Sequence, residues 1–255
     1  MIFKNISDIS AAVEVYRAAH PAPAVPAGQK RISAALCDMD GTLYDSMSRH
    51  AKAWYRMITE QGIACDENEF LMYEGMTGAA TIRLLFQRAF GTVPDEARIK
   101  ELYHLKTLYF SEQPKPDPMP GAQHLVQYFR RMGIRPVLVT GSGQTTLLNR
   151  LDTDYNNAFA ADLRVTAHNV TKGKPNPEPY LKGLEMAQVC ASDAIVLENA
   201  PLGVESGARA GIFTIAVATG PVPLQALNDA GASIVFSSMP QCDKYFPELL
   251  FCLNT

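Results

Sequence analysis

Short apolar runs that alternate with helical segments constrain the fold of this chain more than any other feature of its sequence. The first run spans residues 32–37, and four more follow residue 120, at 135–139, 194–197, 213–218 and 234–236. Short runs without polar alternation are typical of parallel strands that are buried on both faces. Because these strands alternate with helices, the sequence predicts an α/β fold with a doubly wound parallel sheet of the Rossmann-like type.

A long helical stretch interrupts this alternation. Residues 47–112 show apolar residues at three- and four-residue spacing, and the proline-rich stretch that follows cannot continue a helix. We therefore expect residues 31–46 and 116–255 to form the α/β core, and residues 47–115 to form an inserted all-helical domain. Residues 1–30 are expected to form a helical extension and a Pro/Ala tether, because a helical pattern at 8–19 is followed by a proline-rich break.

Composition excludes several classes of function. The net charge is -3, which gives no broad attraction to nucleic acid. The longest apolar runs fall well short of the roughly 20 residues that a membrane span needs. The N-terminal residues include Asp8 and Glu14 and show no apolar signal segment, so we expect a cytoplasmic protein. The five cysteines form no CxxC pair, which suits reduced thiols better than disulfides or a zinc site.

Polar residues stand where three of the expected strands end, at Asp38, Thr140 and Glu198. In open parallel sheets, ligands bind beyond the carboxyl ends of the strands. We therefore expect these three side chains to share one edge of the sheet.

The segment from Cys37 to Ser46, CDMDGTLYDS, carries the strongest chemical signal. The carboxylate of Asp38 is ionised near neutral pH and can attack phosphorus without a base. The leaving oxygen then needs a proton, which Asp40 can supply if its surroundings raise its pKa. The alternative is that these acids only cap a helix, but a cap needs one acid and the loop offers three, counting Asp45.

Attack of one anion on another requires cations nearby. Two unit charges 4 Å apart repel by about 4 kcal/mol at an effective dielectric constant of 20. Lys174, in the loop TKGKPNP, is one candidate, and Lys172 is interpreted as a solvated loop residue. The other candidate is Mg²⁺, which prefers oxygen ligands that Asp38, Glu198 and Asn199 can offer.

The segment Thr140-Gly141-Ser142 follows a strand and opens a helix, so its hydroxyl and N–H groups can hold phosphate oxygens. It lacks the third glycine of a dinucleotide loop and the lysine of a Walker loop. The glycines at 203, 207 and 211 have helical spacing and are interpreted as close-packing positions.

The order of these motifs resembles the haloacid dehalogenase-like hydrolases, in the branch that contains β-phosphoglucomutase and phosphoglycolate phosphatase. The resemblance covers residues 31–237. It implies that Asp38 is the nucleophile, Asp40 the acid and base, Thr140 the phosphate ligand of the second motif and Lys174 the lysine of the third motif. It also implies Mg²⁺ held by Asp38, by the backbone carbonyl of Asp40 and by the acids of the fourth motif, here Glu198 with Asn199. The helical insertion would be a cap domain that closes over the substrate.

Two departures from the family pattern bear on substrate and metal. Asn199 replaces the second acid of the fourth motif, so we expect metal binding to persist but to be weaker. Gly78 stands where the mutase has a cap arginine, which argues against a mutase. His50, Trp54 and Lys106 match positions of the mutase cap, so His50 and Lys106 join Gly141 and Ser142 as candidate substrate-binding residues, although His50 suits a structural role at a domain junction equally well.

These observations favour a phosphatase that hydrolyses a small phosphorylated metabolite, such as a sugar phosphate, through a phospho-aspartate. A mutase is the alternative, and a regulatory binding protein that has lost its chemistry through Asn199 is a third. Dehalogenation is disfavoured because the resembling dehalogenases lack the acid at the Asp40 position. Phosphonate cleavage needs a cap lysine that forms a Schiff base, and no residue is assigned to that role.

Overall fold

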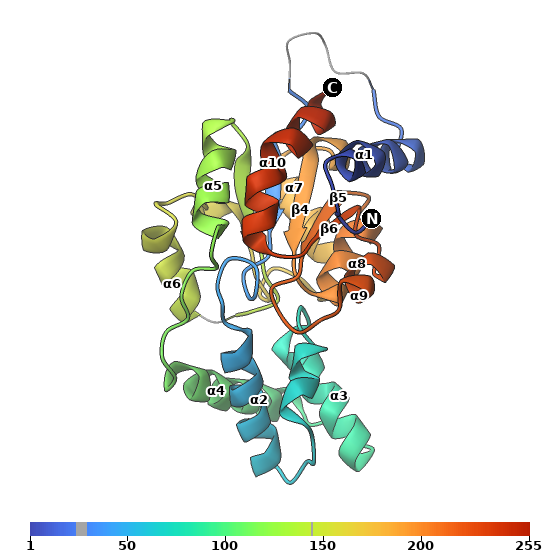
Figure 1. The fold of residues 1–255 in the computed structure, drawn as a ribbon. Helices are drawn as coiled ribbons and strands as arrows, with labels where there is room; N and C mark the ends of the chain where they lie inside the picture. The colour runs from blue at the N-terminus through green and yellow to red at the C-terminus, as the bar shows by residue number, and fades with distance from the viewer. Residues whose placement is uncertain (24–29, 144) are drawn as a thin grey trace.

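A six-stranded parallel sheet forms the centre of the molecule (Figure 1). The structure, a computed structural model, describes residues 1–23, 30–143 and 145–255. In spatial order the strands are β3 (Arg164–Val165), β2 (Arg135–Val139), β1 (Ala34–Cys37), β4 (Ala194–Glu198), β5 (Phe213–Val217) and β6 (Ile234–Phe236). The chain crosses from the β2 side to the β4 side of β1, so the sheet is doubly wound and its switch point lies at β1.

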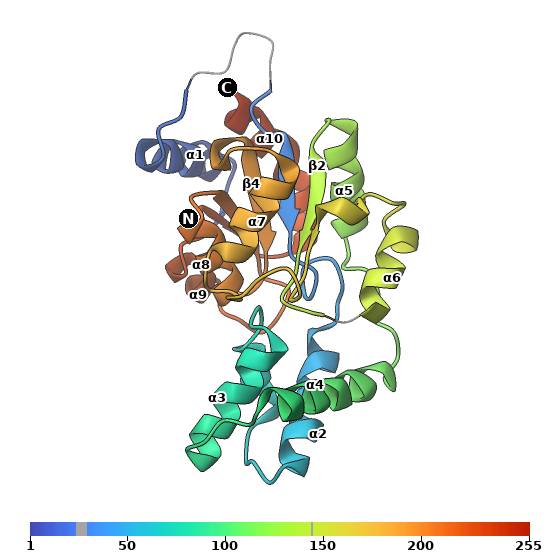
Figure 2. The ribbon, with the colours of Figure 1, turned by 180° about the vertical axis from the view of Figure 1, so that it is seen from behind.

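Helices cover both faces of this sheet (Figures 1 and 2). The helices of the core are α5 (Ala122–Arg131), α6 (Thr145–Asp154), α7 (Glu178–Ala187), α8 (Pro201–Arg209), α9 (Leu224–Asp229) and α10 (Met239–Asn254). Cys37 and Leu138 face a cluster built with α5 and α10, whereas Leu36 and Val139 face a cluster built with α7. This alternation explains why the strands appear in the sequence as continuous apolar runs, since both faces are buried.

The helical insertion lies beyond the carboxyl ends of the strands (Figure 1). It contains α2 (Met47–Glu60), the 3₁₀ helix η1 (Glu67–Leu71), α3 (Gly78–Phe90) and α4 (Glu96–Ser111). These helices pack around their own apolar cluster, which includes Met57, Ile82 and Leu102. An insertion with its own core can keep its shape while it moves relative to the sheet, because few of its buried contacts belong to the sheet.

The N-terminal segment lies against the far edge of the sheet. Ile2 pairs with Val235 beside β6, and α1 (Ser7–Ala19) packs against α10. The hydroxyl of Tyr16 donates a hydrogen bond to the carbonyl of Gly211. The predicted tether at 20–28 falls partly on residues 24–29, which lie outside the described residues.

The predicted fold class is confirmed, because the sheet is parallel, doubly wound and interrupted by an all-helical insertion. All five predicted strands are present, and β3 is an additional strand that the sequence did not indicate. The predicted packing role of the glycines in α8 agrees with the structure, since a methyl group on Gly207 would come within 3.1 Å of Val196. No helix in the described part of the chain is long and apolar enough to cross a membrane.

Candidate active site

Three neighbouring strands bring their polar ends to one edge of the sheet, as the sequence predicts. Asp38 directly follows β1, and its backbone N–H donates to the carbonyl of Leu197 in β4 at 3.0 Å. Thr140 follows β2, and Glu198 is the last residue of β4. All three side chains are buried. Parallel pairing therefore places them in one region although more than 50 residues separate each from the next in sequence.

Lys174 connects two of these strand ends. Its Nζ lies 2.6 Å from Oδ1 of Asp38 and 2.6 Å from Oε1 of Glu198. It also donates to the carbonyl oxygen of Val139 at 3.1 Å, and its side chain is fully buried. Three acceptors thus use all three N–H donors of the ammonium group. The lysine is therefore held in one orientation, with its contact to Asp38 made at Oδ1.

Glu198 is surrounded by donors from the protein itself. Its Oε1 accepts from Lys174 and, at 2.9 Å, from the hydroxyl of Tyr180. Its Oε2 accepts from the backbone N–H groups of Asn199 and Ala200 at 2.9 and 3.1 Å. Both oxygens are therefore occupied by protein donors in this structure, and metal binding by Glu198 stays a prediction. In this structure its contacts orient Lys174.

Burial controls the charge state of this group. It raises the pKa of Asp38, an effect that Lys174 partly offsets. Burial opposes the charge of Lys174 as well, but the carboxylates of Asp38 and Glu198 outweigh it and raise the lysine's pKa. Lys174 is therefore held in its charged form, and a further positive charge beside Asp38 would favour the ionised carboxylate.

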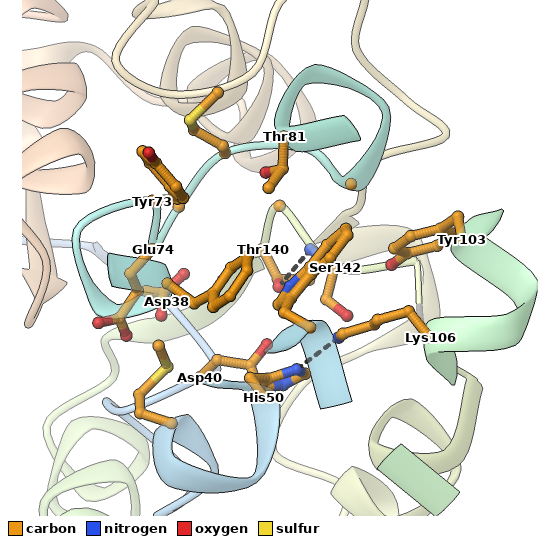
Figure 3. A pocket seen from close by; sticks show the side chains of 17 residues that line it. Asp38, Asp40, His50, Tyr73, Glu74, Thr81, Tyr103, Lys106, Thr140 and Ser142 are labelled. Carbon is orange, nitrogen blue, oxygen red and sulfur yellow. Dashed lines mark hydrogen bonds and ion pairs between the residues drawn. The ribbon is translucent and has the colours of Figure 1, made fainter. Parts of the chain in front are cut away.

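Asp40 lies two residues along the chain in different surroundings. Its Oδ1 accepts from the hydroxyl of Ser46 at 2.6 Å and lies 2.8 Å from Nε2 of His50. The other ring nitrogen of His50, Nδ1, lies 2.6 Å from Nζ of Lys106. Figure 3 shows the three side chains in a row from the core loop to α4. Because a lysine ammonium can only donate, a charged Lys106 makes Nδ1 an acceptor and Nε2–H a donor to Asp40.

The pKa of Asp40 differs from the sequence-based expectation. Burial alone would raise it, but the nearby His50 and hydrogen bonds from His50 and Ser46 bring it below its ordinary value. Burial lowers the pKa of Lys106 to about 7, and burial together with Lys106 lowers that of His50. The condition that the surroundings of Asp40 raise its pKa is therefore not met in this structure. In this state Asp40 is an ionised acid, and its hydrogen bonds with Ser46 and His50 are both made at Oδ1.

The loop after β2 lies against the same space. The N–H of Ser142 donates to Oγ1 of Thr140 at 3.0 Å, and the N–H of Gly143 donates to the hydroxyl of Tyr103 in α4 at 3.1 Å. The second bond joins the core to the insertion. Gly141 also lines this space, as expected of a loop that holds phosphate oxygens.

A cavity of about 60 Å³ lies between the core and the insertion (Figure 3). The core contributes Asp38, Asp40, Thr140, Gly141 and Ser142 to its wall. The insertion contributes polar, charged and aromatic side chains, among them His50, Trp54, Tyr73, Glu74, Tyr103 and Lys106. The structure therefore brings Asp38, Asp40, Thr140 and Lys106 to one cavity. Lys174 and Glu198 are connected to it through Asp38.

Glu74 was not singled out by sequence reasoning. It reaches the site from the segment between η1 and α3, where its Oε1 accepts from Nδ2 of Asn199 at 2.7 Å. Oδ1 of Asn199 accepts from the hydroxyl of Thr42 at 3.0 Å. Burial, with the negative charges of Asp38 and Glu198, raises the pKa of Glu74. In the sequence, Glu74 is marked only by the glycine that follows it, and only the folded chain shows which residue it meets.

Comparisons with known proteins agree with this geometry. The family model of the haloacid dehalogenase-like hydrolases matches residues 32–211. Hexitol phosphatase A of Escherichia coli K12 is 31% identical over 207 residues, which cover 81% of this chain and 91% of the relative. Validoxylamine A 7'-phosphate phosphatase of Streptomyces hygroscopicus subsp. limoneus is 28% identical over 72% of this chain and 85% of its own length.

A solved structure from Bacteroides vulgatus, assigned as a β-phosphoglucomutase, superposes with a TM-score of 0.92 at 40% identity. The match covers 98% of this chain and 100% of that one. The match to the family model extends over the larger part of the chain and includes Asp38, Asp40, Thr140, Lys174 and Glu198. The chain therefore belongs to the haloacid dehalogenase-like hydrolases and is a phosphohydrolase.

Proposed function

We propose that this protein is a Mg²⁺-dependent phosphatase that hydrolyses a small phosphomonoester, such as a sugar phosphate, through a phosphorylated Asp38. One observation carries the proposal. A carboxylate fixed by Lys174 opens onto a small cavity that also holds a second acid, Asp40, and a phosphate-binding type of loop. The names of the sugar-phosphate and related phosphatases among the relatives support a substrate of this class.

The first step transfers the phosphoryl group to the enzyme. Because Lys174 holds Oδ1 of Asp38, we expect Oδ2 to attack phosphorus, while the bond from phosphorus to the leaving oxygen breaks. A proton on Oδ2 of Asp40 passes to that oxygen, which leaves as an alcohol. The approach of a phosphate dianion favours protonation of Asp40, since a neighbouring negative charge raises a carboxyl pKa.

The second step releases phosphate. A water molecule attacks phosphorus of the acyl phosphate, Asp40 takes a proton from it, and the bond from phosphorus to Asp38 breaks. Inorganic phosphate leaves and Asp38 returns to a carboxylate. The hydrogen bonds from Ser46 and His50 hold Asp40 in place through both steps, since they engage only Oδ1. Thr140 and the loop beginning at Gly141 are proposed to hold the phosphoryl oxygens.

The oxygen atoms around Asp38 fit a divalent cation. Asp38 and the partly buried Glu74 are acids whose pKa values are raised by burial and by neighbouring acids, an arrangement that positive charge stabilises. No three acidic, His or Cys side chains among residues 1–23, 30–143 and 145–255 gather as a metal cluster. The proposed set is therefore mixed, with Asp38, Glu74, the amide oxygen of Asn199 and the backbone carbonyl of Asp40. When bound, Mg²⁺ supplies positive charge against the phosphoryl oxygens.

Asn199 is suited to serve with or without the ion. Its Nδ2 donates to Glu74 and its Oδ1 accepts from Thr42. A hydroxyl can donate or accept, so rotation of the amide by half a turn keeps the bond to Thr42 and turns Oδ1 toward Glu74 and the cation. In the absence of the cation, the Nδ2–H group of Asn199 is the donor to the Glu74 carboxylate.

The direct test is a phosphate-release screen over a panel of small metabolite phosphates with Mg²⁺ present. We expect turnover of sugar or comparable phosphates, loss of turnover with EDTA, and recovery when Mg²⁺ is added back. Asp38→Asn should lower the turnover of any substrate by at least about 10⁴-fold, as expected on loss of a nucleophile. Full activity in EDTA, or in Asp38→Asn, would contradict the proposal.

Mutase activity is the second candidate, favoured by the structural match to the protein assigned as a β-phosphoglucomutase. Conversion of β-glucose 1-phosphate into the 6-phosphate without net release of phosphate would establish it. The cavity argues the other way. The lysine in its described wall is Lys106, which is already engaged with His50, so a second phosphate group finds no free lysine in that wall.

A further inference from the structure

Residues 74–77, which we call the clasp, join η1 to α3 and rest directly on loops of the core. A methyl group on Gly141 would lie 2.7 Å from the carbonyl oxygen of Gly75. A methyl group on Gly173 would lie 2.7 Å from Cγ2 and 3.2 Å from the backbone nitrogen of Thr77. Carbon atoms do not approach other heavy atoms this closely without a shift, because interiors are already close-packed. The clasp can therefore occupy this position only against glycine.

Space, and not backbone conformation, sets the requirement at the two core positions. Gly141 and Gly173 do not have positive φ, whereas Gly75 in the clasp has φ of 90°. An alanine at 141 or 173 is therefore compatible with the local backbone and acts as a wedge beneath the clasp. An alanine at either position should therefore disturb the seating of the clasp without disturbing the fold of the core loops.

The clasp carries Glu74 into the site. Glu198 is saturated by Lys174, Tyr180 and backbone N–H groups, so the core alone offers the carboxylate of Asp38 together with amide and carbonyl oxygens. Glu74 adds a second carboxylate, and its Oε1 lies 2.7 Å from Nδ2 of Asn199. The cation site is thus assembled from both sides of the interface between core and insertion.

We propose that seating of the clasp on Gly141 and Gly173 completes the divalent-cation site, so that closure of the insertion and cation binding strengthen each other. This inference rests on the proposed function in requiring a cation beside Asp38. It makes Gly173 a positioning residue, since it touches the clasp and no ligand of the ion. Coupling of this kind is reciprocal: a change that opens the clasp weakens cation binding, and the cation favours the closed form.

A double-mutant cycle on Gly173→Ala and Glu74→Gln tests the coupling through cation binding itself. The dissociation constant of Mn²⁺ is measured for each protein by electron paramagnetic resonance of the free ion. We expect each single change to weaken binding, within the roughly 5- to 150-fold range of such couplings. The double variant should bind no more weakly than Glu74→Gln alone, because the wedge acts only by removing Glu74. Losses that simply add, or unaltered binding in Gly173→Ala, would overturn the inference.

Two further variants separate the wedge from general damage. Gly220→Ala is the matched control, because Gly220 has no positive φ and a methyl group there meets nothing within 4 Å. It should bind Mn²⁺ as the wild type does. Thr77→Ser removes the nearest clashing atom, Cγ2, and keeps the hydroxyl that accepts from the N–H of Ala80. In the Gly173→Ala background it should restore part of the affinity, and failure to do so would count against the clasp.

Trp54 gives a readout of closure that does not depend on turnover. It is the one tryptophan of the chain, lies in α2 and lines the cavity. We expect its fluorescence to change when Mg²⁺ saturates the wild type and to stay unchanged in Gly173→Ala at the same concentration. If the wild type hydrolyses phosphomonoesters in EDTA and binds no Mn²⁺, the proposed function itself is wrong. If it binds Mn²⁺ but Gly173→Ala binds equally well, only the clasp is wrong.

Discussion

Lys174 and Lys106 are two buried lysines of one active site, yet their surroundings give them opposite properties. Lys174 lies in the core between two carboxylates, which raise its pKa. Lys106 lies in the insertion beside a histidine, and burial lowers its pKa to about 7. Direct contact with an acid outweighs the cost of burial in the first case, and its absence leaves burial dominant in the second. The core therefore carries a fixed charge, and the insertion carries one that titrates near neutral pH.

The two aspartates differ in the same way, because each is connected to a different one of these lysines. Asp38 is tied to the permanent charge of Lys174, and Asp40 is tied through His50 to the titratable charge of Lys106. A nucleophile needs a fixed position, whereas an acid and base needs partners whose proton can move. We infer that chemistry is divided in the same way, with bond formation at the core and proton transfer linked to the insertion.

Among the changes to the groups around Asp38, the largest effect is expected from Asp40→Asn, which breaks the division on the proton-transfer side. Turnover of alkyl phosphates should fall by about 10²- to 10⁴-fold, since no group protonates the leaving oxygen. p-Nitrophenolate leaves without a proton, so this variant should release one equivalent in a burst and then stall as a phosphoenzyme. Rapid-mixing absorbance measurements show the burst, and Asp38→Asn is the control that should lack it. A burst in Asp38→Asn would contradict the division.

Lys174→Met should affect both rate and stability. Turnover should fall by roughly 10²- to 10³-fold, as on loss of an electrostatic donor. The free energy of unfolding should fall by about 3–5 kcal/mol, because Asp38 and Glu198 remain buried without their shared cation. Chemical denaturation measures this change, with Lys172→Met as the matched control, since Lys172 is exposed two residues away. Equal stability of Lys174→Met and Lys172→Met would show that the buried ammonium group is not needed to balance the acids.

Lys106→Met should change how the stability of the protein depends on pH. Above about pH 10.5 the amine is neutral in both folded and unfolded states. As the pH falls toward 7, the unfolded chain takes up a proton that the folded chain does not. The wild type therefore loses stability by up to about 1.4 kcal/mol per pH unit across this window. Denaturation between pH 7 and 10 should show a shallower pH slope in Lys106→Met, and an identical slope would place the ammonium group in a solvated site.

The smallest effect is expected from Ser46→Ala. This change removes one of the two groups that hold Oδ1 of Asp40 and should raise the pKa of that acid. The acidic limb of the profile of kcat/KM against pH should move to higher pH, with little change at the plateau. Ser48→Ala, on the exposed side of the same helix start, should leave the profile unchanged. An unshifted limb in Ser46→Ala would show that Asp40 does not set it.

The sequence predicted those features that depend on local pattern. Strands buried on both faces appear as apolar runs, and polar residues at their carboxyl ends must meet in a parallel sheet, which is why Asp38, Thr140 and Glu198 could be grouped. The strand β3 was missed because it has two residues, Arg164 and Val165, and no pattern is visible at that length. Glu198 could be recognised as an acidic residue at the end of a strand. That its carboxylate accepts hydrogen bonds from Lys174, Tyr180 and two backbone N–H groups could not be predicted.

Contacts across the interface between core and insertion could not be predicted. Glu74 meets Asn199 across 125 residues of sequence, and no spacing rule connects a loop of a helical insertion with the end of a strand. The pKa of Asp40 depends on His50 in the same way, because the direction of the shift follows from a hydrogen bond that only the folded chain makes. The candidate catalytic residues could therefore be predicted from short motifs, but the contacts and pKa shifts that the insertion gives them could not.

The account depends most on a covalent phosphoryl group at Asp38, and rapid acid quench during a single turnover tests this directly. The quenched enzyme is digested and the peptides are examined by mass spectrometry. We predict that the peptide containing Asp38 gains one phosphoryl group at early times and loses it as phosphate appears, with greater accumulation in Asp40→Asn. Formation of product in the first turnover with no phosphoryl group on that peptide at any quench time would contradict the account.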